Sequence, residues 1–315
     1  MTSMFSRSLV LKVAAFGPIE KLVRKSFLFR KLVRRFVAGD TLEEALVASD
    51  ALLSQGYYVS LDLLGENVKS EEEALRAKNM YIDMLEAIAS RPTTKLEAPK
   101  EACNISIKLT QCGFDQDDEF AEKNFREVLA AADRHGNFVR VDMEASEYTE
   151  RTLAMIERVW PDFKNTGTVL QTYLYRTPDD LERMMKLGVR LRLVKGAYLE
   201  PATVAFPDKR KVDEAYVTLA KQMLLGAHYP AIATHDEKII NALIAFIEEQ
   251  QIPRERFEFQ MIYGVRRDLQ ERLRKLGYGM RIYVPFGESW YPYFSRRLAE
   301  RPANMFFILK SLFKG

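Results

Sequence analysis

Eight short apolar segments, each followed by a stretch with helical spacing, recur along the chain from residue 57 onward. Each segment is rich in β-branched and other apolar residues and ends at a turn residue or a polar residue, as strands commonly do. Strict alternation of strands with helices predicts parallel strands that are joined by crossover helices. The predicted strands are Tyr57–Leu63, Asn104–Thr110, Asn137–Met143, Thr168–Leu174, Arg190–Lys195, Ala231–His235, Phe257–Ile262 and Met280–Pro285.

The stretches between the strands carry helix start and stop signals. Ser70 is a good N-cap before a run of acidic residues, and Thr177 is a predicted cap with Pro178 in the first turn. A glycine, which suits a helix end, follows four of the stretches, at Gly136, Gly188, Gly226 and Gly277. The predicted helices are Glu71–Ser90, Glu119–His135, Glu147–Trp160, Thr177–Leu187, Lys211–Leu225, Asp236–Gln250, Arg267–Leu276 and Ser289–Leu312.

Eight strand–helix units over residues 57–312 fit a closed (β/α)8 barrel in both number and length. The alternative is a doubly wound open sheet, which usually carries a glycine-rich phosphate turn after its first strand. The first predicted strand is followed by Gly65-Glu66-Asn67, with neither GxGxxG nor GxxxxGK[ST]. The sequence therefore favours an α/β fold of the (β/α)8 TIM-barrel type, with a final helix covering the active site.

Residues 1–54 differ in character from the predicted catalytic barrel, residues 55–315. Thr41 and Glu44 form a capping box for a helix over Glu43–Leu53. Residues 1–40 contain nine Lys and Arg but only two Asp and Glu, whereas the whole chain has a net charge of +3. The barrel is therefore mildly acidic, and we do not expect it to bind nucleic acid.

The basic leader allows two interpretations. Within residues 4–37, apolar and basic residues are interleaved, and Lys21–Val37 is long enough for a basic amphipathic helix of ~25 Å. In the first interpretation, this helix binds an anionic membrane surface reversibly. In the second, its apolar residues pack against the barrel. Its basic residues are Lys21, Arg24, Lys25, Arg30, Lys31, Arg34 and Arg35.

Polar residues stand at the ends of seven of the eight predicted strands, in otherwise largely apolar runs. In a (β/α)8 barrel these carboxyl ends form the active site, and buried charges there are costly unless they are paired or used. The residues are Lys108, Asp142, Gln171, Arg192, Lys195, Thr234, His235, Gln260 and Tyr283.

The final predicted helix carries a second polar pattern. Tyr293, Arg296, Arg297 and Glu300 stand at i, i+3, i+4 and i+7, the spacing of one helix face. A solvated charged face is one interpretation. The other is a buried stripe, in which two adjacent guanidinium groups receive a carboxylate or a phosphate.

Cysteine and histidine usage narrows the class of protein. The two cysteines, Cys103 and Cys112, fit a reducing compartment, and we expect a cytoplasmic protein. The three histidines form neither HxH nor HExxH, so we predict no metal site. No run of ~18 apolar residues predicts a membrane-spanning helix.

Several motifs occur together in the order NISIKLT, VDME, VLQTYLYRT, RLVKGAY, ATH, FEFQM, RIYVP and RRLAERPAN. On these motifs the chain, from about residue 57 to its end, resembles the monofunctional bacterial proline dehydrogenases. The resemblance implies a barrel with non-covalently bound FAD that oxidises L-proline to 1-pyrroline-5-carboxylate. It also implies a membrane quinone as electron acceptor, and hence peripheral contact with the inner face of the cytoplasmic membrane.

The resemblance also implies a role for each matching residue. Asp142 and Arg192 match catalytic positions, and Arg192 lies beside the hydride-accepting nitrogen of the flavin. The implied substrate-binding residues are Lys108, Tyr283, Tyr293, Arg296, Arg297 and Glu300. The implied cofactor-binding residues are Met143, Gln171, Arg192, Lys195, Gly196, Ala197, Thr234, His235 and Gln260.

The residue types agree with this chemistry. The reaction requires a fixed carboxylate and cationic groups near the flavin, which Lys108 and Arg192 are able to supply. No residue of the sequence is an evident base for the substrate amine. Two rival functions remain: a Schiff-base lyase of the aldolase type that uses Lys108 or Lys195, and a non-enzymatic membrane-surface protein.

Overall fold

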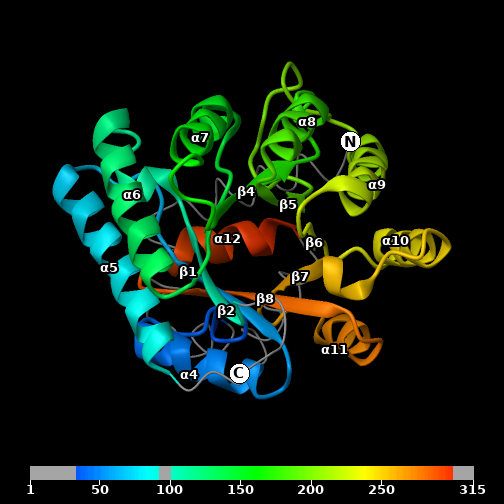
Figure 1. Ribbon diagram of the computed structural model, residues 1–315, viewed down its shortest axis with the longest axis horizontal. Coiled ribbons are helices and arrows are strands. Elements are labelled where there is room, and N and C mark those ends of the chain that lie inside the picture. The colour runs from blue at the N-terminus through cyan, green and yellow to red at the C-terminus, as the bar shows by residue number, and fades with distance from the viewer. Residues whose placement is uncertain (1–32, 92–100, 301–315) are drawn as a thin grey trace, which may run out of the picture.

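The computed structural model describes residues 33–91 and 101–300, with the backbone alone for residues 296–300. Eight parallel strands close into a barrel in the order β1 to β8, and β1 pairs with β8 to complete it (Figure 1). The predicted (β/α)8 fold is confirmed. The strands are β1 (Tyr58–Leu63), β2 (Cys103–Ile107), β3 (Val139–Val141), β4 (Thr166–Gln171), β5 (Arg190–Val194), β6 (Ala231–Ala233), β7 (Glu258–Ile262) and β8 (Gly279–Phe286).

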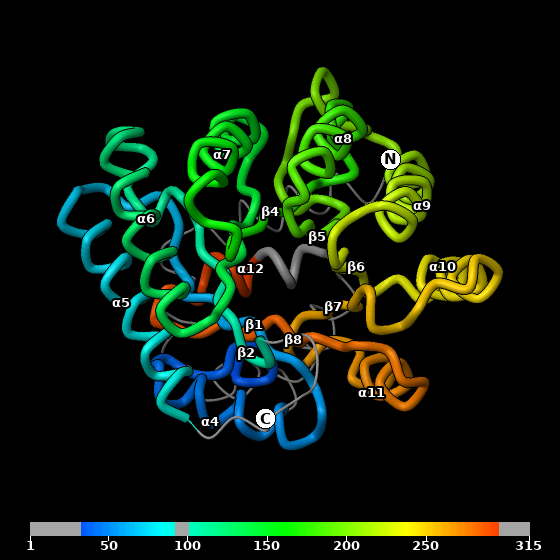
Figure 2. The backbone as a smooth tube through the Cα atoms, viewed as in Figure 1, coloured from blue at the N-terminus to red at the C-terminus, as the bar shows by residue number. Residues whose placement is uncertain are grey.

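A ring of helices surrounds the strands, as the tube in Figure 2 shows. The helices are α4 (Leu42–Leu53), α5 (Glu71–Ser90), α6 (Asp118–Arg134), α7 (Ser146–Val159), α8 (Thr177–Leu187), α9 (Lys209–Gly226), α10 (Glu237–Glu249), α11 (Arg267–Lys275) and α12 (Trp290–Glu300). Two short 3-10 helices, η1 (Leu109–Cys112) and η2 (Arg254–Arg256), precede α6 and β7. The part of the prediction that extends the last helix to residue 312 lies outside the described residues.

The predicted helix starts are largely confirmed. The Ser70 side chain accepts a hydrogen bond from the backbone N–H of Glu73, and Thr41 and Glu44 form the expected capping box. Thr177 is a correction, because Arg176 is the N-cap residue of α8. The Thr177 hydroxyl instead donates to the carbonyl of Gln171 at 2.5 Å and so ties the start of α8 to the end of β4.

Each of the eight strands differs from its predicted bounds by one to three residues at one end or both. β2 ends at Ile107, and the predicted strand residues Leu109 and Thr110 belong to η1 instead. β3 has three residues, although the backbone N–H of Asp142 still donates to the carbonyl of Ile107, the last residue of β2. β4 begins two residues earlier than predicted and ends at Gln171. It includes Gly167, where a Cβ atom would collide with the Phe138 ring and the Arg140 guanidinium. The glycine, which weakens the sequence signal for a strand, is needed there to admit these side chains.

Alternate residues of each strand face opposite sides of the barrel wall. Val59 and Leu61 of β1 belong to the main apolar core between strands and helices, whereas Ser60 is buried among polar groups. Its hydroxyl lies 3.1 Å from the hydroxyl of Ser106 on β2. Most barrels of this type fill their interior with branched apolar residues, but here polar and charged side chains occupy it.

Buried ion pairs occupy the part of the barrel interior near the amino-terminal ends of the strands. Arg281 on β8 binds both carboxylate oxygens of Glu258 on β7, at 2.7 and 3.0 Å. Arg190 on β5 pairs with Glu101 at 2.9 Å, and Arg140 donates to the carbonyls of Thr168 and Arg190. These contacts close the amino-terminal end of the barrel, so any site lies at the opposite end.

α12 lies at the carboxyl-terminal mouth of the barrel. Its residues Trp290, Tyr291, Tyr293 and Phe294 form a small core with Leu64, which follows β1, and with Ile262 at the end of β7. Val33, Phe36 and Val37 complete the same cluster. This end of the basic leader therefore packs on the barrel, as one interpretation predicted. Residues 1–32, which carry most of the leader, lie outside the described residues.

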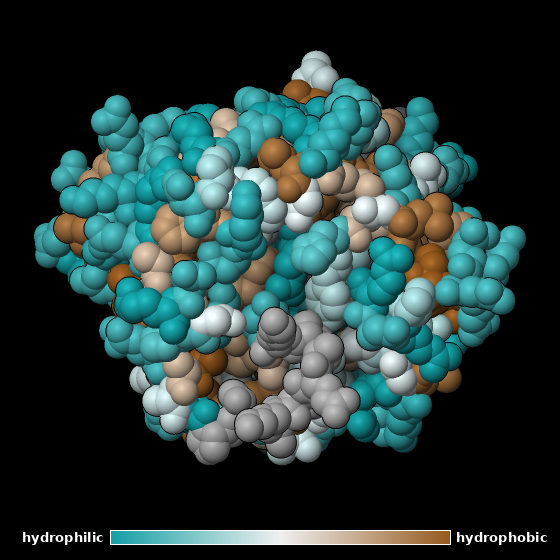
Figure 3. Space-filling view, viewed as in Figure 1, coloured by the Kyte–Doolittle hydropathy of each residue, from teal (hydrophilic) through white to brown (hydrophobic). Residues whose placement is uncertain are grey.

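Charged and polar side chains cover much of the face shown in Figure 3, with smaller apolar patches between them. Ala45, Leu46 and Leu53 of α4 pack into the main core of the barrel. The division at residue 54 stays a prediction. Among the described residues, no helix is both long and apolar enough to span a bilayer.

Candidate active site

The centre of the barrel mouth is the carboxylate of Asp142, which directly follows β3. Its backbone N–H donates to the carbonyl of Ile107 at the end of β2, at 2.8 Å, which holds Asp142 against the neighbouring strand. One carboxylate oxygen accepts from Nη1 of Arg192, and the other accepts from the hydroxyl of Tyr283, both at 2.6 Å. Strands β3, β5 and β8 thus converge on one carboxylate.

Lys108 and Asp62 form a buried ion pair beside this carboxylate. The Lys108 ammonium lies 2.7 Å from Asp62 Oδ1 and 3.7 Å from Asp142 Oδ2. Burial raises the pKa of Asp62 to about 6, although Lys108 opposes this shift. Burial also disfavours the charged ammonium, but Asp62 and Asp142 outweigh it and hold the pKa of Lys108 well above its ordinary value. Lys108 therefore enters the mouth as a cation.

Arg192 is held from three sides. Besides Asp142, its guanidinium donates to Gln260 on β7 at 2.5 Å and to the hydroxyl of Ser106 on β2 at 3.1 Å. It also lies 5.2 Å from the centre of the Tyr283 ring. A cation that is fixed before substrate arrives costs no reorganisation during reaction, which is the arrangement that stabilises developing charge.

Gln171 and Glu144 form the neighbouring part of the mouth. The Gln171 side chain donates to the carbonyl of Glu144 at 2.8 Å. The Glu144 carboxylate accepts from the hydroxyl and the backbone N–H of Thr110, and burial raises its pKa to about 7. Met143, between Asp142 and Glu144, is buried and belongs to the main core.

The remaining predicted cofactor residues form a second group after β5 and β6. The Lys195 ammonium lies 2.5 Å from Asp213 on α9 and 2.8 Å from Asp236, the N-cap residue of α10. The Thr234 hydroxyl accepts from the backbone N–H of Asp236, and His235 Nε2 accepts from the N–H of Ile262 at 2.9 Å. These contacts are separate from those of Asp142 described above, so we treat the predicted residues as two clusters.

The loop between these clusters has a backbone that requires glycine. Gly196 has a φ of +117°, and a Cβ atom there would collide with the Tyr173 ring. Gly196 and Ala197 therefore follow β5 as a close-packed turn, in which the Tyr173 ring fills the space that a side chain at residue 196 would take.

α12 brings part of the predicted stripe to the mouth. Tyr293 is buried against Leu64, so this position is not part of a solvated face. The helix continues through Arg296, Arg297 and Glu300. Their side chains lie outside the described residues, and their roles stay predictions.

Asp62, Ser106 and Glu144 are site residues that the sequence analysis missed. Asp62 stands inside the apolar run of β1, where a carboxylate between leucines was the available signal. Ser106 and Glu144 lie within the motifs NISIKLT and VDME, but neither side chain by itself indicates a buried contact.

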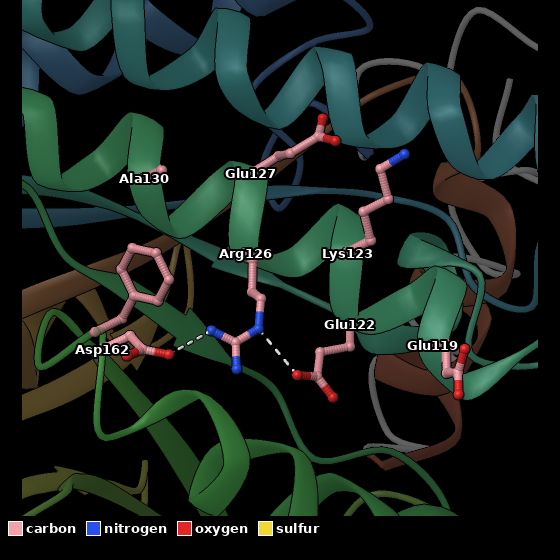
Figure 4. A pocket seen from close by; sticks show the side chains of 8 residues that line it. Glu119, Glu122, Lys123, Arg126, Glu127, Ala130 and Asp162 are labelled. Atoms are coloured by element: carbon pink, nitrogen blue, oxygen red, sulfur yellow. Dashed lines mark hydrogen bonds and ion pairs between the residues drawn. The ribbon is translucent and has the colours of Figure 1, made fainter.

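A surface groove beside α6 is a separate feature (Figure 4). It is lined by α6 and by Asp162 and Phe163 after α7. Arg126 spans it and pairs with Glu122 at 2.9 Å and with Asp162 at 2.7 Å. Because the groove lies on the outside of the helix ring and its arginine is already paired, we do not assign the active site to it.

A closed parallel barrel with fixed cations and a shared carboxylate at its mouth defines a TIM-barrel enzyme. The family model described as proline dehydrogenase matches residues 45–310. The chain belongs to the proline dehydrogenase family, which implies an oxidoreductase with a flavin cofactor.

Individual relatives agree with this assignment. The chain is 42% identical over 290 residues to proline dehydrogenase 1 of Bacillus subtilis, covering 92% of this chain and 93% of that protein. It is 39% identical to the proline dehydrogenase of Deinococcus radiodurans over the full length of both. These relatives support the resemblance that the sequence motifs indicated.

A solved structure shows the same fold. Proline utilization A (PutA) of Bdellovibrio bacteriovorus, inactivated by N-propargylglycine, matches with a TM-score of 0.80 and 26% identity. The match covers 94% of this chain but 36% of that chain, so this protein corresponds to about a third of the PutA chain.

The geometry also weighs against a Schiff-base lyase. A nucleophilic lysine must be neutral, whereas two carboxylates hold Lys108 as a cation and two others pair with Lys195. Lys108, whose pKa is raised by Asp62 and Asp142, is therefore not arranged to lose its proton.

Proposed function

We propose that the protein oxidises L-proline to 1-pyrroline-5-carboxylate, the first step in degradation of proline to glutamate, with non-covalently bound FAD as hydride acceptor. We further propose a membrane quinone as the final electron acceptor. The observation that carries this proposal is the convergence of Lys108, Arg192 and Tyr283 on Asp142 at the mouth of a barrel of this family.

The residues present fit a flavin. FAD, when bound, supplies the two-electron oxidising chemistry that amino-acid side chains lack. On the Asp142 side, Met143, Gln171, Arg192 and Gln260 would hold its ring system. On the other side, the Lys195 ammonium at the end of β5 is a cation of the kind that suits a phosphate-bearing ligand. The proposed cofactor residues there are Lys195, Gly196, Ala197, Thr234 and His235.

Lys108 would bind the substrate carboxylate, together with Arg296 and Arg297 from α12. Asp62 fixes the ammonium of Lys108 at 2.7 Å, so the lysine is oriented before proline binds. Tyr283, Tyr293 and Glu300 would shape the space around the pyrrolidine ring. Holding the ring carbon in one position is the main contribution of these contacts.

Water, and not a side chain, would take the proton of the substrate amine. Asp62 is fully buried, and both oxygens of Asp142 already accept hydrogen bonds from Arg192 and Tyr283. Asp142 would instead keep Arg192 oriented. We therefore assign Asp142 and Arg192 to the catalytic machinery without giving either the role of base.

A quinone is dissolved in the bilayer, so electron transfer to it requires the protein to contact the membrane surface. We propose a cytoplasmic protein that binds the inner face of the cytoplasmic membrane peripherally, with the basic leader contributing. Each basic residue near an anionic surface contributes about 1 kcal/mol, screened by salt.

An absorbance spectrum tests the proposal. The purified protein should be yellow, and L-proline added without oxygen should bleach the flavin bands, whereas D-proline serves as the control. Acid precipitation should release the colour into the supernatant, and colour in the pellet would show covalent attachment. A colourless protein that cannot be reconstituted with FAD would overturn the proposal.

A further inference from the structure

Glu200, in the loop between β5 and α9, bridges two loops of the barrel mouth. One carboxylate oxygen accepts from the backbone N–H of Ser146 at 2.8 Å, and the other accepts from the Ser146 hydroxyl. Ser146 is the first residue of α7. Glu200 is thus joined to a helix that lies 54 residues away in sequence.

The start of α7 lacks a cap from its own sequence. Ala145 occupies the N-cap position and has no side chain that accepts a hydrogen bond. The first N–H groups of a helix have no partner within the helix, and its amino-terminal end favours a negative charge. The Glu200 carboxylate meets both requirements from another loop, and charge-assisted bonds of this kind are the stronger ones.

The two loops that Glu200 joins carry different groups of proposed flavin residues. Gly196 and Ala197 lie a few residues before Glu200, whereas Asp142 and Met143 lie between β3 and Ser146. The later half of the β5–α9 loop has separate support. Ala205 forms a bridge with Leu174, and neighbouring backbone bonds continue it.

We propose that Glu200 is a positioning residue for the flavin. Its carboxylate holds the turn at Gly196 against α7, and so against the segment between β3 and α7 that carries Asp142. This inference rests on the proposed function. Loss of the carboxylate should free the early half of the loop, leave the bridge at Ala205 intact and weaken retention of the flavin.

The test measures how fast the holoenzyme releases its flavin after dilution, from the rise in fluorescence of free FAD. Glu200→Ala should raise the release rate about fivefold, because a lost helix cap typically changes an equilibrium constant by a factor of about five. Glu200→Gln keeps one acceptor oxygen and should lie between Glu200→Ala and the unchanged protein. Glu214→Ala removes an exposed carboxylate of α9 and should change nothing.

Ser146→Ala tests the same contact from the side of the hydrogen-bond donor. If Glu200→Ala fails to fold, the flavin release rate of Ser146→Ala still tests the proposal. It removes the hydroxyl but keeps the N–H, so its effect should be smaller. Combined with Glu200→Ala, it should add little, because both substitutions break the same contact. If the two substitutions instead raise the flavin release rate additively, the proposal is overturned.

A merely structural role gives a different result. Glu200→Ala would then lower the melting temperature of the holoenzyme and leave flavin release within twofold of the unchanged protein, which would overturn the inference. If the wild-type protein itself binds no flavin, the proposed function is overturned. This result is distinct from normal flavin release in Glu200→Ala, which overturns the further inference alone.

Discussion

Asp142 Oδ1 lies 2.6 Å from Arg192 Nη1, and both side chains are largely buried. Removing one partner of such a pair leaves an uncompensated charge, at a cost of about 3–5 kcal/mol. Because Arg192 keeps its contacts with Gln260 and Ser106, the fold should tolerate this loss better than the reaction does.

We expect Asp142→Ala to lower kcat/KM for proline by more than tenfold, with the flavin retained. Tyr283→Phe removes one neutral donor to the same carboxylate and should cost about 1 kcal/mol, roughly fivefold. Steady-state kinetics with flavin content measured on each sample checks both values. Wild-type kinetics for Asp142→Ala would show that the pair only supports the fold.

Arg296→Ala or Arg297→Ala should mainly raise the KM for proline. Truncating one partner of a buried charge contact costs about 2–5 kcal/mol, which is roughly thirtyfold to several-thousandfold. Flavin content should survive, and Arg210→Ala, at an exposed position of α9, is the control. Unchanged kinetics in both variants would mean that this face of α12 is solvated.

Glu144→Gln should stabilise the protein at neutral pH more than at acidic pH. Burial raises the pKa of Glu144 from 4.5 to about 7, so the native state binds this proton more tightly than the unfolded state does. The contribution of Glu144 to stability therefore falls as pH rises from 4.5 to about 7, by about 3 kcal/mol in all. The glutamine avoids that loss.

Urea unfolding at pH 5, 6, 7 and 8 measures this difference. Glu147→Gln, in the first turn of α7 and without such burial, is the matched control. If the free energies of unfolding of Glu144→Gln and wild type run parallel across this range, Glu144 does not hold its proton as inferred.

The basic leader should increase binding to anionic liposomes, and salt should weaken that binding. Val33 and Val37 pack on α12, so a chain beginning at Val33 removes most of the basic residues and keeps this contact. Sedimentation with vesicles at low and high salt compares the two chains. Equal liposome binding by both chains would show that residues 1–32 do not contribute to it. A chain that begins near Gly39 would then test whether residues 33–38 contribute.

The fold could be predicted from the sequence because alternation of strands and helices is a local signal. Thr177–Leu187 and Glu71–Ser90 were predicted at their observed bounds. The start of β4 was not, because Gly167 is a poor strand former. Its place depends on Arg140 of β3 and on Phe138, the residue before β3.

The candidate site could be predicted only in part. Polar residues at strand ends indicated Lys108, Asp142, Arg192 and Lys195, but not their partners. Arg192 and Lys195 are three residues apart, an odd spacing that turns them to different surroundings, toward Asp142 and toward Asp213. Contacts between strands, such as that of Arg192 with Ser106, depend on barrel register, which no local pattern specifies.

The packing of Val33 and Val37 on α12 also bears on how the protein is made. Residues 33–37 leave the ribosome before the first barrel strand, whereas α12, which carries both proposed carboxylate-binding arginines, emerges after the last one. The barrel wall closes when β8 pairs with β1, and only then does α12 find its complete surface. A chain that stops short of α12 would therefore lack both proposed carboxylate-binding arginines, and we expect such partly synthesised chains not to turn over proline.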